Sequence, residues 1–189
     1  SSNTDGSINT TYTSVNTTAG FSISQYTGNG TVGATVGHGL GATVKFLIIK
    51  KTDEVKDWTV KVIPPAAGAD RLELNNNDAT ASEGAGSGSL FNATNPNSSV
   101  ITLGDHAQTN ENGAAYIAYS WAEIKGFSSF GSYKGNGGTD GAFIYTGFKP
   151  AFIIMKSSSH AVNWKVHDNK RDSINNGSGA SLSPNENSA

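Results

Sequence analysis

The sequence predicts an all-β protein built as an antiparallel β-sandwich or jelly roll. Its apolar residues fall in short runs rich in β-branched and aromatic side chains, and clusters of Gly, Asn, Pro and Ser separate these runs. The 23 glycines suit tight turns, because Gly adopts the positive φ angles that many turns require. No stretch sustains helical periodicity. Short strands joined by turns therefore explain the pattern better than helices do.

The predicted elements follow in order along the chain. Residues 1–19 are mainly Ser, Thr, Asn and Gly, and they predict an extended connector. Strands are expected over Thr43–Ile49, Trp58–Ile63, Arg71–Leu74, Ser99–Leu103, Ala115–Ile124, Ala142–Tyr145, Ala151–Met155 and Asn163–Val166. Residues 114–124 are also compatible with a short helix, but their aromatic and β-branched side chains favour a long strand. About ten strands in this arrangement indicate a sandwich or jelly roll of the concanavalin type.

One motif occurs twice. The first copy contains Gly20-Phe21-Ser22, Tyr26, Gly28-Asn29-Gly30, Gly41, Phe46, Lys50 and Trp58, and the second contains Gly126-Phe127-Ser128, Tyr133, Gly135-Asn136-Gly137, Gly147, Phe152, Lys156 and Trp164. Most positions are offset by 106 and the Tyr and Gly-Asn-Gly positions by 107, which indicates a one-residue insertion after Phe127. A period of this length predicts tandem duplication of a domain. We therefore expect a β-sandwich repeat over residues 20–130 and a truncated second repeat over 131–189, taken from a longer chain of modules.

Composition and charge exclude several classes of partner. Charged residues make up 15% of the chain and the formal net charge is −2, which gives no electrostatic case for nucleic acid. The basic residues of 149–156 and 165–171 are dispersed and suit a solvated face. The chain has no cysteine, so disulfides and thiolate chemistry are excluded. Neither a membrane-length apolar run nor a signal peptide is present, and we expect a soluble protein without a membrane partner.

No residue pattern predicts catalysis. The Glu-x-Asp-x-x-Glu pattern of sandwich glycosidases and the Gly-x-Ser-x-Gly pattern of serine hydrolases are both absent. The isolated candidates are Asp53-Glu54, Glu123, Asp168 near Arg171 and Asp172, and the scattered His38, His106, His160 and His167. Solvated or capping carboxylates explain the acidic residues better than general acids or bases do. We expect no enzyme, no catalytic residue and no cofactor.

Two groups of oxygen-bearing residues are candidate calcium sites. They are Asp105 with Asn110, Glu111 and Asn112, and the segment Asn75–Asp78. Neither has the alternating acidic spacing of a dedicated calcium loop, so turn-forming side chains are favoured and no metal is expected.

Trp58 and Trp164 allow two interpretations, as core residues or as platforms for sugar stacking. Each lies twelve residues after a phenylalanine that is expected to be buried, which favours the core. The segments 53–57 and 157–162 differ between the copies and lie in predicted loops, where a binding module places its specificity. The sequence leaves the ligand-binding residues unknown.

A longer set of motifs carries a resemblance. It comprises Gly20-Phe21-Ser22-Ile23, Tyr26-Thr27-Gly28-Asn29-Gly30, His38-Gly39-Leu40-Gly41, Tyr116-Ile117-Ala118-Tyr119 with Ala122-Glu123, Gly126-Phe127-Ser128 and the run from Gly141 to Phe152. Together these motifs resemble an uncharacterised tandem domain of tail-fibre and tail-associated proteins of marine bacteriophages, over most of residues 8–172. The chain departs from that pattern in two places. Ala42-Thr43-Val44 stands where proline is usual, and the second copy stops where the family pattern continues into further strands.

The resemblance implies a structural protein of the virion tail, in a tail fibre or appendage that engages host-surface glycans or proteins. It also implies a homo-oligomer, a trimer in most tail fibres, in contact with other virion proteins. Two alternatives stay open, a capsid decoration or filament-forming protein without a ligand and a secreted lectin-like adhesin.

Overall fold

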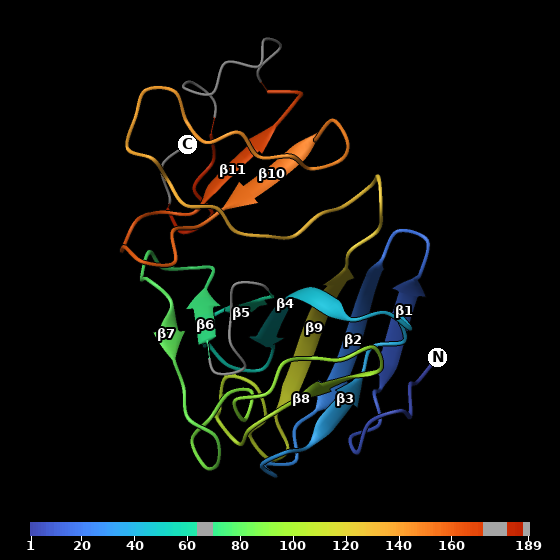
Figure 1. Ribbon diagram of the computed structural model, residues 1–189. Coiled ribbons are helices and arrows are strands. Elements are labelled where there is room, and N and C mark those ends of the chain that lie inside the picture. The colour runs from blue at the N-terminus through green and yellow to red at the C-terminus, as the bar shows by residue number, and fades with distance from the viewer. Residues whose placement is uncertain (64–69, 172–180, 187–189) are drawn as a thin grey trace.

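The computed structural model describes residues 1–63, 70–171 and 181–186, and these are all-β without a helix. The largest sheet has seven antiparallel strands in the order β1-β2-β9-β4-β5-β6-β7 (Figure 1). They are β1 Tyr12–Asn16, β2 Phe21–Thr27, β9 Ala115–Ala122, β4 Val44–Lys51, β5 Thr59–Val62, β6 Asp70–Glu73 and β7 Ala81–Ser82. Two antiparallel two-stranded sheets accompany it, β3 (Thr35–Gly37) with β8 (Val100–Thr102) and β10 (Phe152–Met155) with β11 (Lys165–Asp168). The all-β, antiparallel part of the expected fold is confirmed.

The main core lies between one face of the large sheet and the β3–β8 pair. Strand β9 shows why, because its side chains alternate between fully buried and half-buried positions along eight residues. Tyr116 and Ala118 of β9 and Leu47 of β4 face this core, where they meet Val36 of β3 and Ile101 of β8. We call this face of the sheet the inner face.

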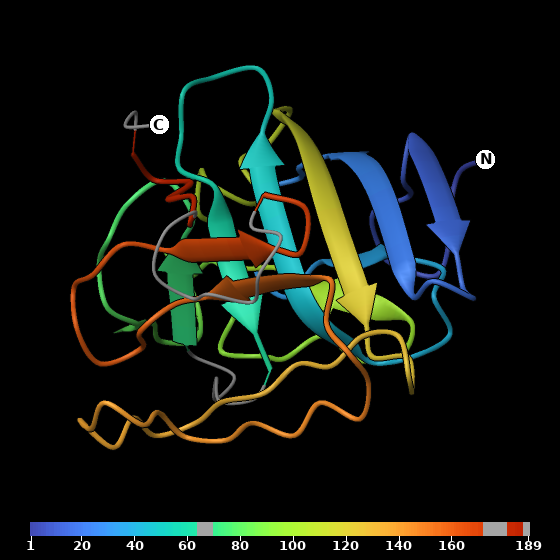
Figure 2. The same cartoon turned by 90° about the horizontal axis from the view of Figure 1, so that it is seen from above.

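A second, smaller cluster covers part of the opposite, outer face. It joins Phe46, Ile48 and Val60 of the large sheet to Ile154 of β10 and to Trp164, which precedes β11. The β10–β11 hairpin accordingly lies over the part of the sheet formed by β4, β5 and β6 (Figure 2). The C-terminal segment thus packs on the first segment rather than standing apart.

Residues 1–19 are not a connector over their whole length, because β1 pairs with β2 and Ile8 is buried in the main core. Sequence reasoning missed β1 and β2 because most of their buried positions are polar, with Tyr26 as the exception. Thr13 is buried beside Ser24, and the hydroxyls of Ser22 and Ser24 donate to backbone carbonyls of residues 38 and 37. Hydroxyl groups paired in this way can replace apolar side chains at a buried position.

The predicted strands from Thr43 onward form near their expected places, with one exception. Residues 115–122 are a strand and not a helix, as expected. Residues 142–145 form no strand, and Phe143 and Tyr145 are 91% and 83% exposed. β-branched and aromatic content alone did not suffice there, because a strand also needs a hydrogen-bonded neighbour.

The two copies of the motif share one structural feature, the register of a hairpin. Four residue pairs join β4 to β5, from Phe46↔Val62 to Ile49↔Thr59. Adding 106 to each residue number gives the pairs that join β10 to β11, from Phe152↔Asp168 to Met155↔Lys165. The correspondence does not extend to β3, because its counterpart in the described part of residues 131–150 has no strand.

Candidate functional site

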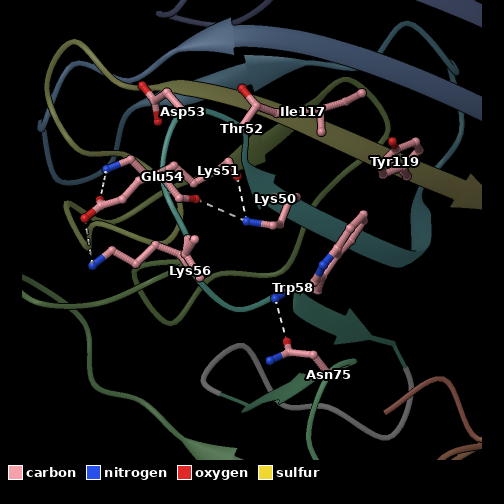
Figure 3. A pocket seen from close by; sticks show the side chains of 11 residues that line it. Lys50, Lys51, Thr52, Asp53, Glu54, Lys56, Trp58, Asn75, Ile117 and Tyr119 are labelled. Carbon is pink, nitrogen blue, oxygen red and sulfur yellow. Dashed lines mark hydrogen bonds and ion pairs between the residues drawn. The ribbon is translucent and has the colours of Figure 1, made fainter. Parts of the chain in front are cut away.

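An open groove lies on the outer face of the large sheet, with a volume of about 780 Å³ (Figure 3). Its lining comes from the outer face of β4 and β9, from the loop that joins β4 to β5, and from a residue that follows β6. The lining residues are Lys50, Lys51, Thr52, Asp53, Glu54, Val55, Lys56, Trp58, Asn75, Ile117 and Tyr119.

The floor of the groove is set by strand alternation. Ile117 and Tyr119 point outward from β9 because their neighbours Tyr116 and Ala118 point into the main core. Lys50 lies beside Ile117 in the β4–β9 register. Figure 3 shows the side chains of Lys50, Tyr119 and Trp58 on the same side of the sheet. The floor therefore combines the Tyr119 ring with an aliphatic side chain and an ammonium group, and the Trp58 ring lies beside it.

Trp58 forms one wall and is 36% exposed. Its backbone N–H donates to Asn75 Oδ1 over 2.8 Å, and Asn75 Nδ2 donates to Asp57 Oδ1 over 2.8 Å. Gln108 Nε2 donates to the other oxygen of Asp57 over 2.6 Å. These bonds fix the backbone at Trp58 while its indole ring stays accessible.

The loop on the other side is held by ion pairs. Lys51 Nζ lies 2.6 Å from Glu54 Oε2 and 2.5 Å from Glu111 Oε2, although Lys51 itself is buried. The hydrogen bonds to Glu111 and Glu54 raise the pKa of Lys51, and the bond to Lys51 lowers the pKa of Glu54. Lys50 Nζ donates to the carbonyl of Lys51 over 2.7 Å. The loop is thus tied to the sheet from two sides.

The acidic groups of the groove hold its loop in place through a hydrogen bond and ion pairs. Asp53 Oδ2 accepts a hydrogen bond from the N–H of Ala115 over 2.8 Å, at the beginning of β9. Glu54 is engaged by Lys51 and lies 3.7 Å from Lys56. A groove with accessible aromatic rings and rigidly held polar groups suits binding of a ligand with both apolar and hydroxyl-bearing faces, such as a sugar.

The predicted calcium candidates do not converge on a site. Asp105 accepts hydrogen bonds from Ser87 Oγ (2.8 Å) and the N–H of Gly88 (2.6 Å), and these bonds lower its pKa. Asn110 is buried, and its amide donates to the carbonyl of Gly104 over 2.6 Å. Glu111 instead pairs with Lys51. Within the residues that the structure describes, no group of three or more His, Asp or Glu side chains is placed to hold a metal ion.

The remaining members of the calcium candidates organise turns. Asn75 holds the backbone of Trp58, and Asn76 Oδ1 accepts from the N–H of Asp78 over 3.0 Å. The side chain of Asn112 lies against Gly30. These are the roles that the turn interpretation predicts for Asx residues.

The other candidate carboxylates also bond to backbone groups. Glu123 accepts from the N–H of Phe130 over 3.1 Å. Asp168 accepts from the backbone N–H groups of Arg171 and Lys170 and from Arg171 Nε, which lowers its pKa. Asp172 lies outside the described residues.

The four histidines lie in separate places. His38 is buried, accepts at Nδ1 from the N–H of Leu40 and has Nε2 3.3 Å from the carbonyl of Asn97, while burial lowers its pKa. His106 accepts at Nδ1 from the N–H of Gln108. His160 Nδ1 lies 2.8 Å from Ser159 Oγ, and His167 pairs with Ile153 across the second hairpin. Each histidine supports its own loop or strand.

The structure separates the two tryptophans that the motif makes equivalent. Trp164 is a core residue as expected, at 2% exposure, and its Nε1 donates to the carbonyl of Glu73 over 2.9 Å. Trp58 is partly open to solvent and lines the groove, so the core interpretation is wrong for this copy. Trp58 stays exposed because the C-terminal hairpin packs on the neighbouring part of the sheet and contributes no residue to the groove.

Part of the groove could be found from the sequence. The loop 53–57 differs between the two copies and four of its residues line the groove, whereas the lining contains no residue of 157–162. Lys50, Ile117 and Tyr119 were missed. Alternation puts Ile117 and Tyr119 on one face of a strand, but no local signal shows that this strand pairs with β4.

The model of one family, described as a domain of unknown function, DUF7483, matches residues 1–189. The chain belongs to the DUF7483 family. No curated protein and no solved structure matches this DUF7483 chain. In the ranges that the structure describes, no helix has the length and apolar character to cross a membrane.

Proposed function

We propose that this DUF7483 chain is a non-enzymatic binding module that recognises surface glycans through the outer-face groove. The observation that carries the proposal is the exposure of Trp58 next to Tyr119 in a groove whose loop is held rigidly by Lys51 and Asn75. The C–H face of a sugar ring can stack on an indole or phenol ring while its hydroxyl groups bond to nearby polar side chains. A held loop reduces the entropy that is lost on binding.

The wider setting of the proposal is a virion tail fibre or tail appendage of a bacteriophage that attaches to its host. It rests on the sequence resemblance, which also brings a trimeric assembly and contacts with other virion proteins. An open groove gives weak single contacts, and several copies on one fibre would combine them into strong attachment through avidity. In this setting the chain is a tandem array of sandwich modules. The shared register of the two hairpins supports that duplication.

Glycan binding can be tested with the full chain and purified surface polysaccharides of candidate host bacteria. Titration followed by tryptophan fluorescence and calorimetry should show saturable binding. Trp58→Ala should weaken binding about tenfold or more, as loss of an aromatic anchor does, and Trp58→Phe should retain part of it. Phe143→Ala is the matched control, because Phe143 is an aromatic residue that is 91% exposed and does not line the groove.

Two results would contradict the proposal. Equal binding by the Trp58→Ala variant and the parent chain would remove the groove from recognition. Absence of polysaccharide binding together with binding to empty capsids would favour the capsid decoration role.

A further inference from the structure

Strand β10 has an open edge. Along its described length β10 pairs with β11 alone, and β11 is bridged on its other side through Val166 and Leu182. The stretch Phe152–Met155 contains neither a charged residue nor a proline. Such residues commonly protect free edges from pairing with other chains. An uncharged edge of this kind is competent to accept a strand.

The hydrogen-bond pattern shows which backbone groups face the open edge. The N–H of Asn169 donates to the carbonyl of Ala151 over 3.0 Å, so the backbone groups of residue 151 point toward β11. Because these directions alternate along an antiparallel strand, Ile153 and Met155 also turn toward β11. Phe152 and Ile154 therefore direct their N–H and C=O groups to the open edge.

The first hairpin shows what occupies this edge when it is filled. The N–H of Ile63 donates to the carbonyl of Lys45, which is the same bond shifted by 106 residues. In β4 the backbone N–H and C=O groups of Phe46 and Ile48 therefore point away from β5. These two residues pair with Trp121 and Tyr119 of β9. The edge that is free in β10 is the edge that β9 fills in β4.

Side-chain exposure points to the same missing neighbour. Leu47 is fully buried on the inner face of β4, whereas its counterpart Ile153 is 42% exposed. Phe46 is buried and its counterpart Phe152 is 61% exposed. Both faces of β10 therefore carry apolar surface that an added strand would cover in part.

We propose that the open edge of β10 is an acceptor site for an extended polypeptide strand of the β9 type, supplied by another chain segment and added antiparallel in the register that β9 takes on β4. The fitting strand alternates small residues with aromatic ones. In β9 the small residues Ala118 and Ser120 face the inner side, and Tyr119 and Trp121 face the outer side. Addition of a strand gives affinity through main-chain hydrogen bonds and specificity through alternate side chains. This inference is independent of glycan binding.

The test uses the full chain and a peptide of residues 114–124 that carries a soluble lysine tail. Amide hydrogen exchange is followed by nuclear magnetic resonance. Saturating peptide should slow exchange of the Phe152 and Ile154 amides on the order of tenfold or more, because these amides gain hydrogen bonds. The amides of Ile153 and Met155, already bonded to β11, should change little. The same peptide with Tyr119→Pro is the control and should give no protection.

Two substitutions at one position separate backbone pairing from side-chain contact. Phe152→Pro removes the N–H group that faces the open edge, at the first residue of an edge strand, where proline is tolerated. This variant should bind the peptide about tenfold more weakly. Phe152→Ala keeps the N–H and should retain most of the binding. Circular dichroism should show both variants folded.

Three outcomes would overturn the inference. One is unchanged exchange of the Phe152 and Ile154 amides at millimolar peptide. Another is equal loss of binding in the two variants, which would make the contact one of side chains. The third is protection of these amides without peptide that grows with protein concentration, since β10 would then pair with itself in a second copy.

Discussion

The two hairpins of this DUF7483 chain have the same strand register in very different surroundings. The β4–β5 hairpin has β9 on one edge and β6 on the other, and an apolar cluster packs on each of its faces. The β10–β11 hairpin packs one face on the large sheet through Ile154 and Trp164 and leaves Phe152 and Ile153 exposed. Local sequence therefore sets the register of a hairpin, whereas neighbouring strands set which of its residues become core.

The strongest test of this comparison uses the equivalent tryptophans. Trp164→Ala should cost about 3–5 kcal/mol of unfolding free energy, because it opens a cavity and removes the hydrogen bond to Glu73. Trp58→Ala should cost about 1 kcal/mol or less, as a partly exposed side chain in the groove. Urea denaturation of both variants measures the difference. Equal losses would mean that the two sites have the same environment in solution.

The equivalent aliphatic residues give the next largest difference. Leu47→Ala should cost about 2–4 kcal/mol, because Leu47 is fully buried in the main core. Ile153→Ala should cost less than about 1 kcal/mol, since Ile153 is 42% exposed. Thermal and urea unfolding of the two variants check this prediction. A cost at Ile153 as large as that at Leu47 would show that another chain already covers the second hairpin.

A third test uses Lys61, whose counterpart in the second hairpin is His167. Lys61 is buried over the ring of Phe91, and burial lowers its pKa from 10.5 to about 8. Between these pH values the unfolded chain binds a proton that the folded chain has released. The unfolding free energy should therefore rise by about 2 kcal/mol from pH 8 to pH 10.

Denaturation at several pH values measures this rise. Lys61→Met should abolish it and His167→Met should leave it unchanged. Tyr26 and Tyr116 set the upper end of the pH range over which stability rises. Burial raises their pKa values, so their ionisation in the unfolded chain lowers the unfolding free energy above about pH 10. A rise that persists in the Lys61→Met variant would assign the pH dependence to other groups.

The smallest expected effect concerns the glycines that precede the two hairpins. Gly41 and Gly147 have φ angles of +67° and +80°, and at neither residue would an added methyl group meet an atom within 4 Å beyond its chain neighbours. Alanine at each should therefore cost about 1 kcal/mol through backbone strain alone. Unfolding of Gly41→Ala and Gly147→Ala compares them. A neutral Gly147→Ala would show that the chain before β10 is not held in the conformation found before β4.

Much of the fold could be predicted from the sequence because strands and turns leave local signals. The run from Val44 to Lys51, the alternation of Ala115–Ala122 and the turn residues around them locate β4 and β9. The repeated motif also predicts that Phe152 and Trp164 frame a hairpin like that of Phe46 and Trp58. Strands β1 and β2 left no such signal, since the buried residues Thr13, Ser22 and Ser24 are polar and bond to partners that include residues 11 to 16 positions away.

The binding groove was only partly accessible to sequence reasoning. Residues 53–57 could be identified as a loop that differs between the copies, and a loop is a reasonable place for specificity. The contribution of Ile117 and Tyr119 depends on β9 lying next to β4, although the two strands are far apart in the sequence. Such a long-range pairing is chosen by the packing of the whole sheet and leaves no mark in either strand alone.

The sequence by itself determined the all-β class, the turns and the register of both hairpins, because these depend on residues close together in the chain. Tertiary structure alone decided that Trp58 is accessible while Trp164 is buried, although the motif makes them equivalent. It also decided that the edge of β4 is filled by β9 while the edge of β10 is open. The physical reason is that burial and edge pairing depend on what lies beside a strand. The two hairpins have similar local sequences but different neighbours, because the first is part of the large sheet and the second packs on the face of that sheet.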